Sequence, residues 1–389
     1  MLRIVQLHNS YKEKGGEDTI SINDAINLEK NGHEVKKYIK HNLNLNSLVG
    51  FVQLILSYLK LNNQEKDIIN FIGNKTDIVH IYNYFPQWPT WIFEAINKKK
   101  IPIVVSLGNY RIGCINGLLY RKNQICLKCI EKNSFVFPIF NKCYKNNFFI
   151  SLFAKIYQSK FKRNALKYID GFIVPHNFSK KIHEKIGLET NKIHIKENFT
   201  FFSRSKKYSY NPHSNLVIYV GRLDEYKGIN WVIDHWNKLN TTLKLIIIGP
   251  AKDYMSGKIN EINKNIIVQG EVENKLIFEY LSKAKFMIFP SKMYEAGTPL
   301  SLIEGLAAGL PILGSNIKPI NEMVVHNKNG LLFELDNFDD FYNKFKKLEK
   351  NEVLLNSMSL NSIKIFDDNY SHKKNYNKLI NIYNKILNN

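Results

Sequence analysis

Residues 216–248 read LVIYVGRLDEYKGINWVIDHWNKLNTTLKLIII, and this stretch decides the fold. The apolar run 216–220 predicts a strand, residues 228–239 a helix, and the apolar run 243–248 a second strand. A strand, a turn, a helix and another strand in this order are typical of a doubly wound α/β domain with a parallel sheet. The turn between the first strand and the helix holds glycine and basic residues.

The alternation of strands and helices continues on both sides of this stretch and predicts two doubly wound domains. The polar segment 203–214 separates them, which gives a first domain over 1–202 and a second over 203–369. The C-terminal helix, about 370–389, is expected to join the first domain. Because ligands of open α/β sheets bind beyond the carboxyl ends of the strands, the expected site is a cleft between the two domains. Further strands are predicted at 3–7, 33–39, 77–82, 101–107, 170–175, 265–269, 286–289 and 311–313, and further helices at 19–30, 90–97, 275–284 and 298–308.

Composition and charge limit the classes to which this protein can belong. The chain has 389 residues, of which 44% are hydrophobic, enough for two cores, and its formal net charge is +21. Such a positive charge can serve to bind nucleic acid, an anionic membrane surface or phosphorylated substrates. The alternative is that it comes from lysines on solvated faces that bind no partner. The longest apolar stretch, 48–61, is shorter than the roughly 20 residues of a spanning helix. We therefore expect a cytoplasmic protein, peripheral at most to the inner face of the plasma membrane.

The turn at 221–228, GRLDEYKG, is a candidate anion site. Gly221 allows a tight exit from the strand, and Arg222 and Lys227 can both face one anion near a helix N-terminus. A diphosphate fits this pair, since arginine grips two oxygens and lysine adds a point charge. The alternative is two exposed cations on a loop. Neither half of the chain has a GxGxxG motif after a strand, which disfavours a dehydrogenase.

A second candidate segment, 294–311, reads YEAGTPLSLIEGLAAGLP. Glu295 lies in a predicted loop, and Pro299 fits the first turn of a helix. Glu304 lies within that apolar helix, where a carboxylate is unfavourable without a partner. A ribose diol is one partner, and a buried salt bridge with Arg222 or a lysine is the alternative. The helix N-terminus, near Thr298 and Leu300, offers free amides to an anion.

All four cysteines lie between 114 and 143, and their pattern suggests zinc. Two residues separate the central pair, a spacing with which both thiolates can reach one tetrahedral ion. A structural zinc and small buried thiols are both open, whereas disulfides are disfavoured in a reducing compartment. The candidate ligands are Cys114, Cys126, Cys129 and Cys143.

These motifs resemble the family-four retaining glycosyltransferases over nearly the whole chain. The resemblance implies two facing Rossmann-like domains, the GT-B architecture. It places Arg222 and Lys227 on the donor diphosphate, Glu295 on the donor sugar and Glu304 on the ribose. One departure is that the two glutamates have one more residue between them than is usual in the family, which an extra loop residue around Gly297 would absorb.

The first domain carries the same resemblance. Gly15 and Gly16 match a glycine loop that borders the phosphates and the acceptor, and glycines let a backbone approach a ligand closely. In the second domain, Gly270 and Val272 match the segment whose backbone holds the base. Gly108 departs from the pattern, because relatives commonly have at this position a histidine that contacts the donor sugar.

The predicted function is retaining transfer of a sugar from a UDP- or GDP-sugar to a glycan or lipid-linked acceptor, in synthesis of bacterial surface polysaccharide. No Asp-x-Asp motif is present, so the sequence implies no catalytic metal. The alternatives are a non-hydrolysing sugar-nucleotide epimerase, a non-catalytic sugar-nucleotide-binding protein and, on charge alone, a nucleic-acid binder. We expect no nucleic-acid partner. The oligomeric state is left open.

Overall fold

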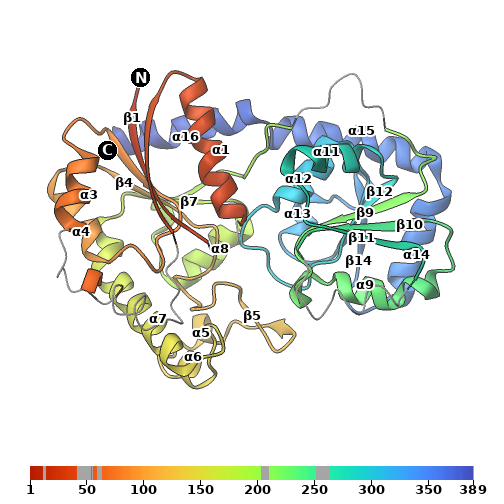
Figure 1. Cartoon of the computed structure of the whole chain (residues 1–389), viewed down its shortest axis with the longest axis horizontal. Helices are drawn as coiled ribbons and strands as arrows, with labels where there is room; N and C mark the ends of the chain where they lie inside the picture. The colour runs from red at the N-terminus through yellow and green to blue at the C-terminus, as the bar shows by residue number, and fades with distance from the viewer. Residues whose placement is uncertain are drawn as a thin grey trace. The chain divides into compact units, whose positions relative to one another are not determined.

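The computed structural model describes residues 1–11, 15–41, 54, 56–58, 64–202, 210–250 and 263–388. The chain divides into two compact units (Figure 1). Unit 1 comprises Met1–Leu119, Leu127–Asn198 and His372–Asn389, and unit 2 comprises Tyr120–Cys126 and Phe199–Ser371. Most of the predicted linker 203–214 and of the apolar stretch 48–61 lies outside the described residues. Among the helices that are described, none has the length and apolarity needed to cross a bilayer.

Unit 1 is built on a six-stranded sheet in which every pairing is parallel. Its order is β2-β1-β3-β4-β7-β8. The central strands are short apolar runs buried on both faces, as expected where helices cover both sides. The strands are β1 (Arg3–Ser10), β2 (Glu34–His41), β3 (Ile78–Ile81), β4 (Ile103–Ser106), β7 (Gly171–Val174) and β8 (Ile193–Ile195).

Helices cover both faces of this sheet. On one face α1 (Gly16–Lys30) and α16 (His372–Leu387) bury residues such as Leu28 and Tyr383 against the strands. Because α16 presents an apolar stripe to this face, the end of the chain packs with unit 1 (Figure 1). The other face holds the larger core, to which three helices contribute: α3 (Gln64–Ile72), α4 (Trp91–Lys98) and α7 (Phe148–Lys160).

Unit 2 has a second six-stranded parallel sheet, in the order β11-β10-β9-β12-β13-β14. In chain order this is 3-2-1-4-5-6, the arrangement of a Rossmann fold. The strands are β9 (Leu216–Val220), β10 (Lys244–Ile248), β11 (Ile266–Gly270), β12 (Phe286–Phe289), β13 (Ile312–Ser315) and β14 (Gly330–Phe333). The main helices are α9 (Ile229–His235), α11 (Asn274–Ser282), α12 (Leu300–Ala307), α14 (Phe338–Lys350) and α15 (Glu352–Asn369). The predicted fold class of two doubly wound α/β domains is confirmed.

The strand order of unit 2 reverses between β9 and β12, which pair directly. In open α/β sheets the connections at such a switch point run to opposite faces, and ligands bind beyond the carboxyl ends of the two strands. The GRLDEYKG turn follows β9, and the loop with Glu295 follows β12. Chain topology alone therefore brings the two candidate segments together.

One insertion was not predicted. A hairpin of β5 (Tyr120–Arg121) and β6 (Gln124–Ile125) belongs to unit 2, although the residues on either side belong to unit 1. Its two turn residues, Lys122 and Asn123, have φ of 51° and 59°. Positive φ at both positions is the mark of a type I′ turn, which suits a two-residue hairpin. The other α-helices in the described part of the chain are α5 (Lys128–Glu131), α6 (Phe137–Phe140), α8 (Asn177–Ile186) and α13 (Ile320–Met323).

Candidate functional site

The turn after β9 ends at Gly228, whose φ is 74°. A Cβ at this position would lie 2.0 Å from the carbonyl oxygen of Pro290, so only glycine fits. The left-handed residue also ends the 3₁₀ turn Glu225–Lys227 and places the start of the following helix at Ile229 rather than at 228 as predicted. The close approach to Pro290 brings Lys227 beside the loop that follows β12.

Arg222 is held by its own turn. Its Nη2 donates to Tyr226 Oη at 2.7 Å, and Tyr226 Oη donates to Asp224 Oδ2 at 2.6 Å. Its Nε lies 3.3 Å from the same carboxylate oxygen, and the side chain is 51% exposed. The ring of Tyr120, from the β5–β6 hairpin, stands edge-on to the ring of Tyr226 with centroids 6.1 Å apart. The guanidinium is thus oriented but remains accessible to a ligand.

Lys227 does not share an anion with Arg222 in this structure. Its Nζ donates to both oxygens of Glu295, at 2.7 and 2.9 Å. Ser291 Oγ donates to the same carboxylate at 2.8 Å, and the carboxylate is 9% exposed. The residue predicted to bind the diphosphate and the residue predicted to bind the sugar, 68 positions apart, therefore form one ion pair. An ammonium group has three N–H donors, so this pairing leaves Lys227 capacity for a phosphate oxygen.

Glu304 lies in the second turn of α12. Burial raises the pKa of its carboxyl from 4.5 to about 8. Within the described part of the chain, its carboxylate has no ion pair or hydrogen bond, including with Arg222 or a lysine. This partly exposed carboxylate is therefore suited to a ligand with hydroxyl donors.

The other residues of unit 2 that the sequence predicts to bind the donor lie at or near the start of α12 and the end of β11. Pro299 is the residue before α12 and not within its first turn as predicted, because its ψ of 123° is extended. Leu300 begins the helix, and Thr298 precedes Pro299 in a buried position. Gly270 ends β11 with φ of 73°, and Val272 follows it and packs on the core. Because β11 is the edge strand, this segment lies two strands away from β9.

In unit 1, Gly15 and Gly16 lead into α1, with Gly15 as the residue before the helix. Asp18 caps this end, accepting from the amide of Gly15 at 2.8 Å, and it also pairs with His8 Nε2 at 2.8 Å. The loop is therefore fixed by buried hydrogen bonds of Asp18, which the sequence did not predict.

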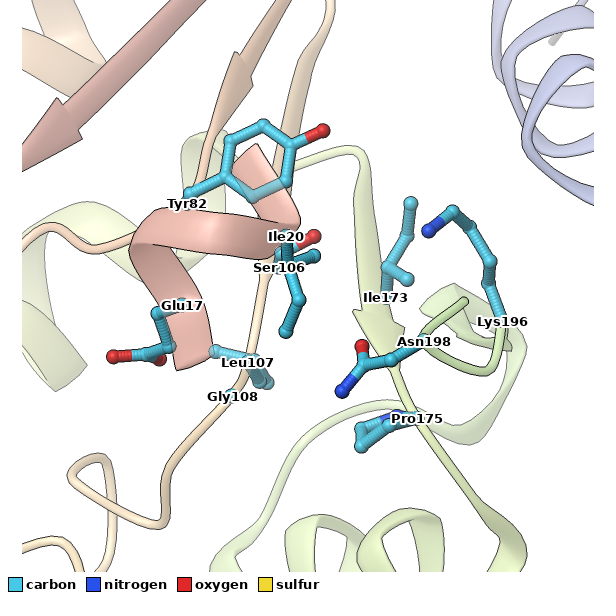
Figure 2. A pocket seen from close by; sticks show the side chains of 10 residues that line it. All are labelled: Glu17, Ile20, Tyr82, Ser106, Leu107, Gly108, Ile173, Pro175, Lys196 and Asn198. Carbon is cyan, nitrogen blue, oxygen red and sulfur yellow. The ribbon is translucent and has the colours of Figure 1, made fainter. Parts of the chain in front are cut away.

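A pocket, whose space is about 370 Å³ when the open solvent at its mouth is included, lies beside this loop, beyond the ends of several strands (Figure 2). Lys196 and Tyr82 on its wall both contact the buried carboxylate of Asp24, at 3.0 and 2.8 Å. Its lining residues are Glu17, Ile20, Tyr82, Ser106, Leu107, Gly108, Ile173, Pro175, Lys196 and Asn198.

The predicted zinc site finds no support. Among the residues that the structure describes, which include all four cysteines, no three or more His, Cys, Asp or Glu side chains gather as a metal site. Cys126 falls in the hairpin segment of unit 2, whereas Cys114, Cys129 and Cys143 belong to unit 1. Cys114 is buried with its Sγ 3.0 Å from Asn116 Oδ1, which is a local contact that needs no metal.

The two doubly wound units, with the candidate residues at the switch point of the second, define the GT-B class of fold. Solved structures with this fold include HepE from Anabaena in complex with UDP and glucose, with a TM-score of 0.68 at 12% identity, covering 98% of this chain and 100% of that one. A glycosyltransferase from Rickettsia africae has a TM-score of 0.69 at 16% identity, covering 100% and 99% of the two chains.

Sequence comparison adds a match within the second unit. Residues 201–365 match the family model of glycosyl transferases group 1. A relative from Campylobacter jejuni is the N-acetylgalactosamine-N,N'-diacetylbacillosaminyl-diphospho-undecaprenol 4-alpha-N-acetylgalactosaminyltransferase, 29% identical over 39% of this chain and 45% of that protein. A second, the capsular polysaccharide biosynthesis glycosyltransferase CapM from Staphylococcus aureus, is 24% identical over 52% of each. The matches span about half the length of such curated relatives.

Proposed function

We propose that this protein is a retaining glycosyltransferase that moves a sugar from a nucleoside diphosphate donor, a UDP- or GDP-sugar, to a hydroxyl of a glycan or lipid-linked acceptor. The observation that carries the proposal is the arrangement at the switch point of unit 2. Three groups lie there on the segments that follow β9 and β12: an oriented arginine, a lysine paired with a carboxylate, and the partly exposed carboxylate of Glu304, which has no partner in the described residues. The likeness to HepE, whose structure holds UDP, agrees with such a ligand.

Each group has a role that its chemistry suits. Arg222 and Lys227 bind the diphosphate, and their charge stabilises the negative charge that grows on the departing phosphate. The amides at the start of α12 add to this stabilisation, since the N-terminus of a helix favours anions. Glu304 accepts hydrogen bonds from the ribose hydroxyls, Gly270 and Val272 offer backbone groups to the base, and Glu295 accepts from the donor sugar.

The chemical step follows from these roles. The bond between the anomeric carbon and the phosphate oxygen breaks ahead of the new bond, through an oxocarbenium-like transition state, and the nucleoside diphosphate departs. The acceptor oxygen then bonds to the same face of the sugar, and its proton passes to the departing phosphate oxygen. This scheme needs no carboxylate nucleophile, in contrast with the two-carboxylate scheme of glycoside hydrolases.

The pocket of unit 1 is our proposed site for the acceptor, with Gly15 and Gly16 allowing close approach of the backbone. Its wall combines apolar residues with hydroxyl, amide and ammonium groups, a mixture that suits a sugar ring. The Campylobacter relative is named for an acceptor on diphospho-undecaprenol, and the CapM relative for capsular polysaccharide. We extend this class of acceptor, a growing surface glycan on a lipid carrier, to the present chain.

Thermal unfolding in the presence of nucleotides tests the donor. At a concentration 100 times its dissociation constant, a ligand specific for the folded state adds about 2.7 kcal/mol of stability. We expect UDP or GDP, and a corresponding nucleotide sugar, to raise the melting temperature, whereas NAD and single-stranded DNA should not. A chain stabilised by none of the UDP-, GDP- or ADP-sugars would not be the proposed enzyme.

Membrane docking is the second part of the proposal, since the net charge is +21 and the acceptor is taken to be lipid-linked. The protein should bind vesicles containing phosphatidylglycerol but not pure phosphatidylcholine vesicles, because the attraction is to surface charge. Sedimentation at rising ionic strength should show weaker binding as salt screens the charges. Binding that salt does not change would remove electrostatic docking at the inner face of the membrane from the account.

A further inference from the structure

The chain between β4 and β7 carries a group of large apolar side chains on its surface. Four residues within 135–149 are exposed: Phe149 by 73%, Phe140 by 70%, Val136 by 54% and Phe135 by 46%. Removing such side chains from water is favourable, so a group of them on a surface indicates a place where a partner binds. We call these four residues the apolar patch.

The helices α6 and α7 bring the patch together. In α6, Pro138 and Ile139 are buried, whereas Phe140, the last residue of the helix, is exposed. The ring centroid of Phe140 lies 5.7 Å from that of Phe148, the first residue of α7, and Phe148 lies 5.5 Å from Phe149. The rings at the end of one helix and the start of the next therefore form one continuous surface.

Side-chain hydrogen bonds hold the turn between these helices. Asn147 Oδ1 accepts from the amide of Ile150 at 3.0 Å and so caps α7. Ser151 Oγ accepts from the amide of Tyr144 at 3.0 Å and donates to the carbonyl oxygen of the same residue at 3.2 Å. The exposed rings thus stand on an ordered turn, which presents them without a further change of the backbone.

Lysines accompany the apolar patch. Between residues 128 and 149 the chain has four lysines but one acidic residue, Glu131, so the surface is positively charged. All four ammonium-bearing side chains are exposed, and Lys128 Nζ lies 5.5 Å from the ring centroid of Phe137 in α6. The four are Lys128, Lys132, Lys142 and Lys145.

The charge decides which partner fits. Lysines among exposed rings suit the boundary of an anionic bilayer, where ammonium groups reach lipid phosphates and rings enter the headgroup region. A second copy of the chain would set lysine against lysine in a symmetric interface, which like charges disfavour. The exposed Val353 and Leu360 of α15 offer a comparison, because residues 350–368 have two lysines and three acidic residues and hence no excess of positive charge.

We propose that the apolar patch and its four lysines are the surface by which unit 1 docks on an anionic membrane, with the rings of Phe140 and Phe149 in the headgroup region. The inference rests on the proposed membrane docking and deepens it, since net charge alone does not say which face meets the bilayer. Figure 1 shows α5, α6 and α7 at one edge of unit 1, on the other side of its sheet from α1 and α16.

Sedimentation of the full chain with vesicles of phosphatidylglycerol and phosphatidylcholine tests the assignment. Phe140→Ala/Phe149→Ala should weaken binding by about tenfold or more, because it removes the two most exposed rings of the patch. Lys132→Gln/Lys142→Gln should weaken it by about fivefold for each lysine and reduce its dependence on salt. Val353→Ala/Leu360→Ala, the matched control on α15, should bind as the wild type does.

The depth of the ring is a second readout. The indole introduced by Phe149→Trp should fluoresce at shorter wavelength on vesicles and be quenched by brominated lipid, after subtraction of the wild-type signal, whereas that of Val353→Trp should show neither change. Patch variants that sediment as the wild type does, or an unquenched indole in Phe149→Trp, would overturn the assignment. If Phe140→Ala/Phe149→Ala instead turns a dimer into a monomer on light scattering and vesicle binding persists, the patch is an interface between copies and the assignment is wrong.

Nucleotide binding separates this inference from the proposed function. The patch variants should melt and bind UDP or GDP as the wild type does, because the proposed nucleotide contacts belong to unit 2. A wild type that binds neither nucleotide would contradict the transferase, and one that binds no anionic vesicle would contradict membrane docking together with this assignment. If the wild type binds both and the patch variants still sediment unchanged, the assignment alone is wrong.

Discussion

Replacing Arg222 with alanine should weaken the binding of UDP or GDP far more than that of uridine or guanosine. The guanidinium is oriented by Tyr226 and Asp224 and is half exposed, so its loss removes a diphosphate contact without opening a core. A hydrogen bond between charged groups corresponds to about 1.5–3 kcal/mol, or roughly 10- to 150-fold in affinity. Titration calorimetry with nucleotide and nucleoside measures the difference.

Lys227→Ala should give the same selective loss, together with a lower melting temperature. Its removal takes an ammonium group away from the carboxylate of Glu295, whose side chain is 9% exposed, and breaking an ion pair in so buried a position is destabilising. Glu295→Gln in the Lys227→Ala background should recover the stability but not the nucleotide affinity. Lys283→Ala, which removes an exposed lysine paired with Glu279, is the matched control and should change neither. Equal losses for nucleoside and nucleotide would refute the phosphate role of both cations.

Glu304→Gln should remove the pH dependence that this carboxyl imposes on stability. Burial raises its pKa to about 8 in the folded chain, whereas an unfolded chain titrates near 4.5. The folded state therefore keeps a proton that the unfolded state loses, and stability falls as pH rises from about 4.5 to 8. The amide cannot ionise, so the variant should gain melting temperature over the wild type at pH 8.5 and little at pH 4.5. Each unit of pKa shift corresponds to about 1.4 kcal/mol, so a gain of a few kcal/mol is expected.

The same variant should lose transfer activity and nucleotide affinity. Ribose hydroxyls that donate to the ionised carboxylate lower its pKa, so UDP or GDP should bind with release of a proton near neutral pH. Calorimetry in buffers of different ionisation enthalpy detects that proton, and Glu304→Gln should abolish it. If 2′,3′-dideoxy nucleotides bind the wild type as tightly as normal ones, the ribose role is wrong.

The fold could be predicted because it depends on local patterns. Apolar runs such as 286–289 and 216–220 coincide with β12 and β9, and their spacing gives two parallel sheets. Helix ends were less accurate where a single residue decides them. Gly228 is left-handed and Pro299 is extended, so α9 and α12 each begin after the predicted residue.

The pairings within the candidate site could not be predicted from local sequence. Local sequence singles out Arg222, Lys227 and Glu304 as candidates, whereas the Lys227–Glu295 ion pair depends on β9 lying beside β12. Tyr120 reaches Tyr226 through an inserted hairpin, and Glu17 contacts residue 108 across 91 positions of chain, and neither contact has a local pattern. The cysteine spacing suggested a zinc site that the described residues do not assemble.

Retaining transfer is the central claim, and the anomeric configuration of the product tests it most directly. The protein would be incubated with an α-linked nucleotide sugar that stabilises it and with a diphospho-undecaprenol-linked glycan, and the product followed by proton NMR. The account predicts one nucleoside diphosphate released per sugar transferred and an α linkage in the product. A β linkage would contradict retention, and an epimerised nucleotide sugar formed without acceptor or nucleotide release would contradict transfer itself.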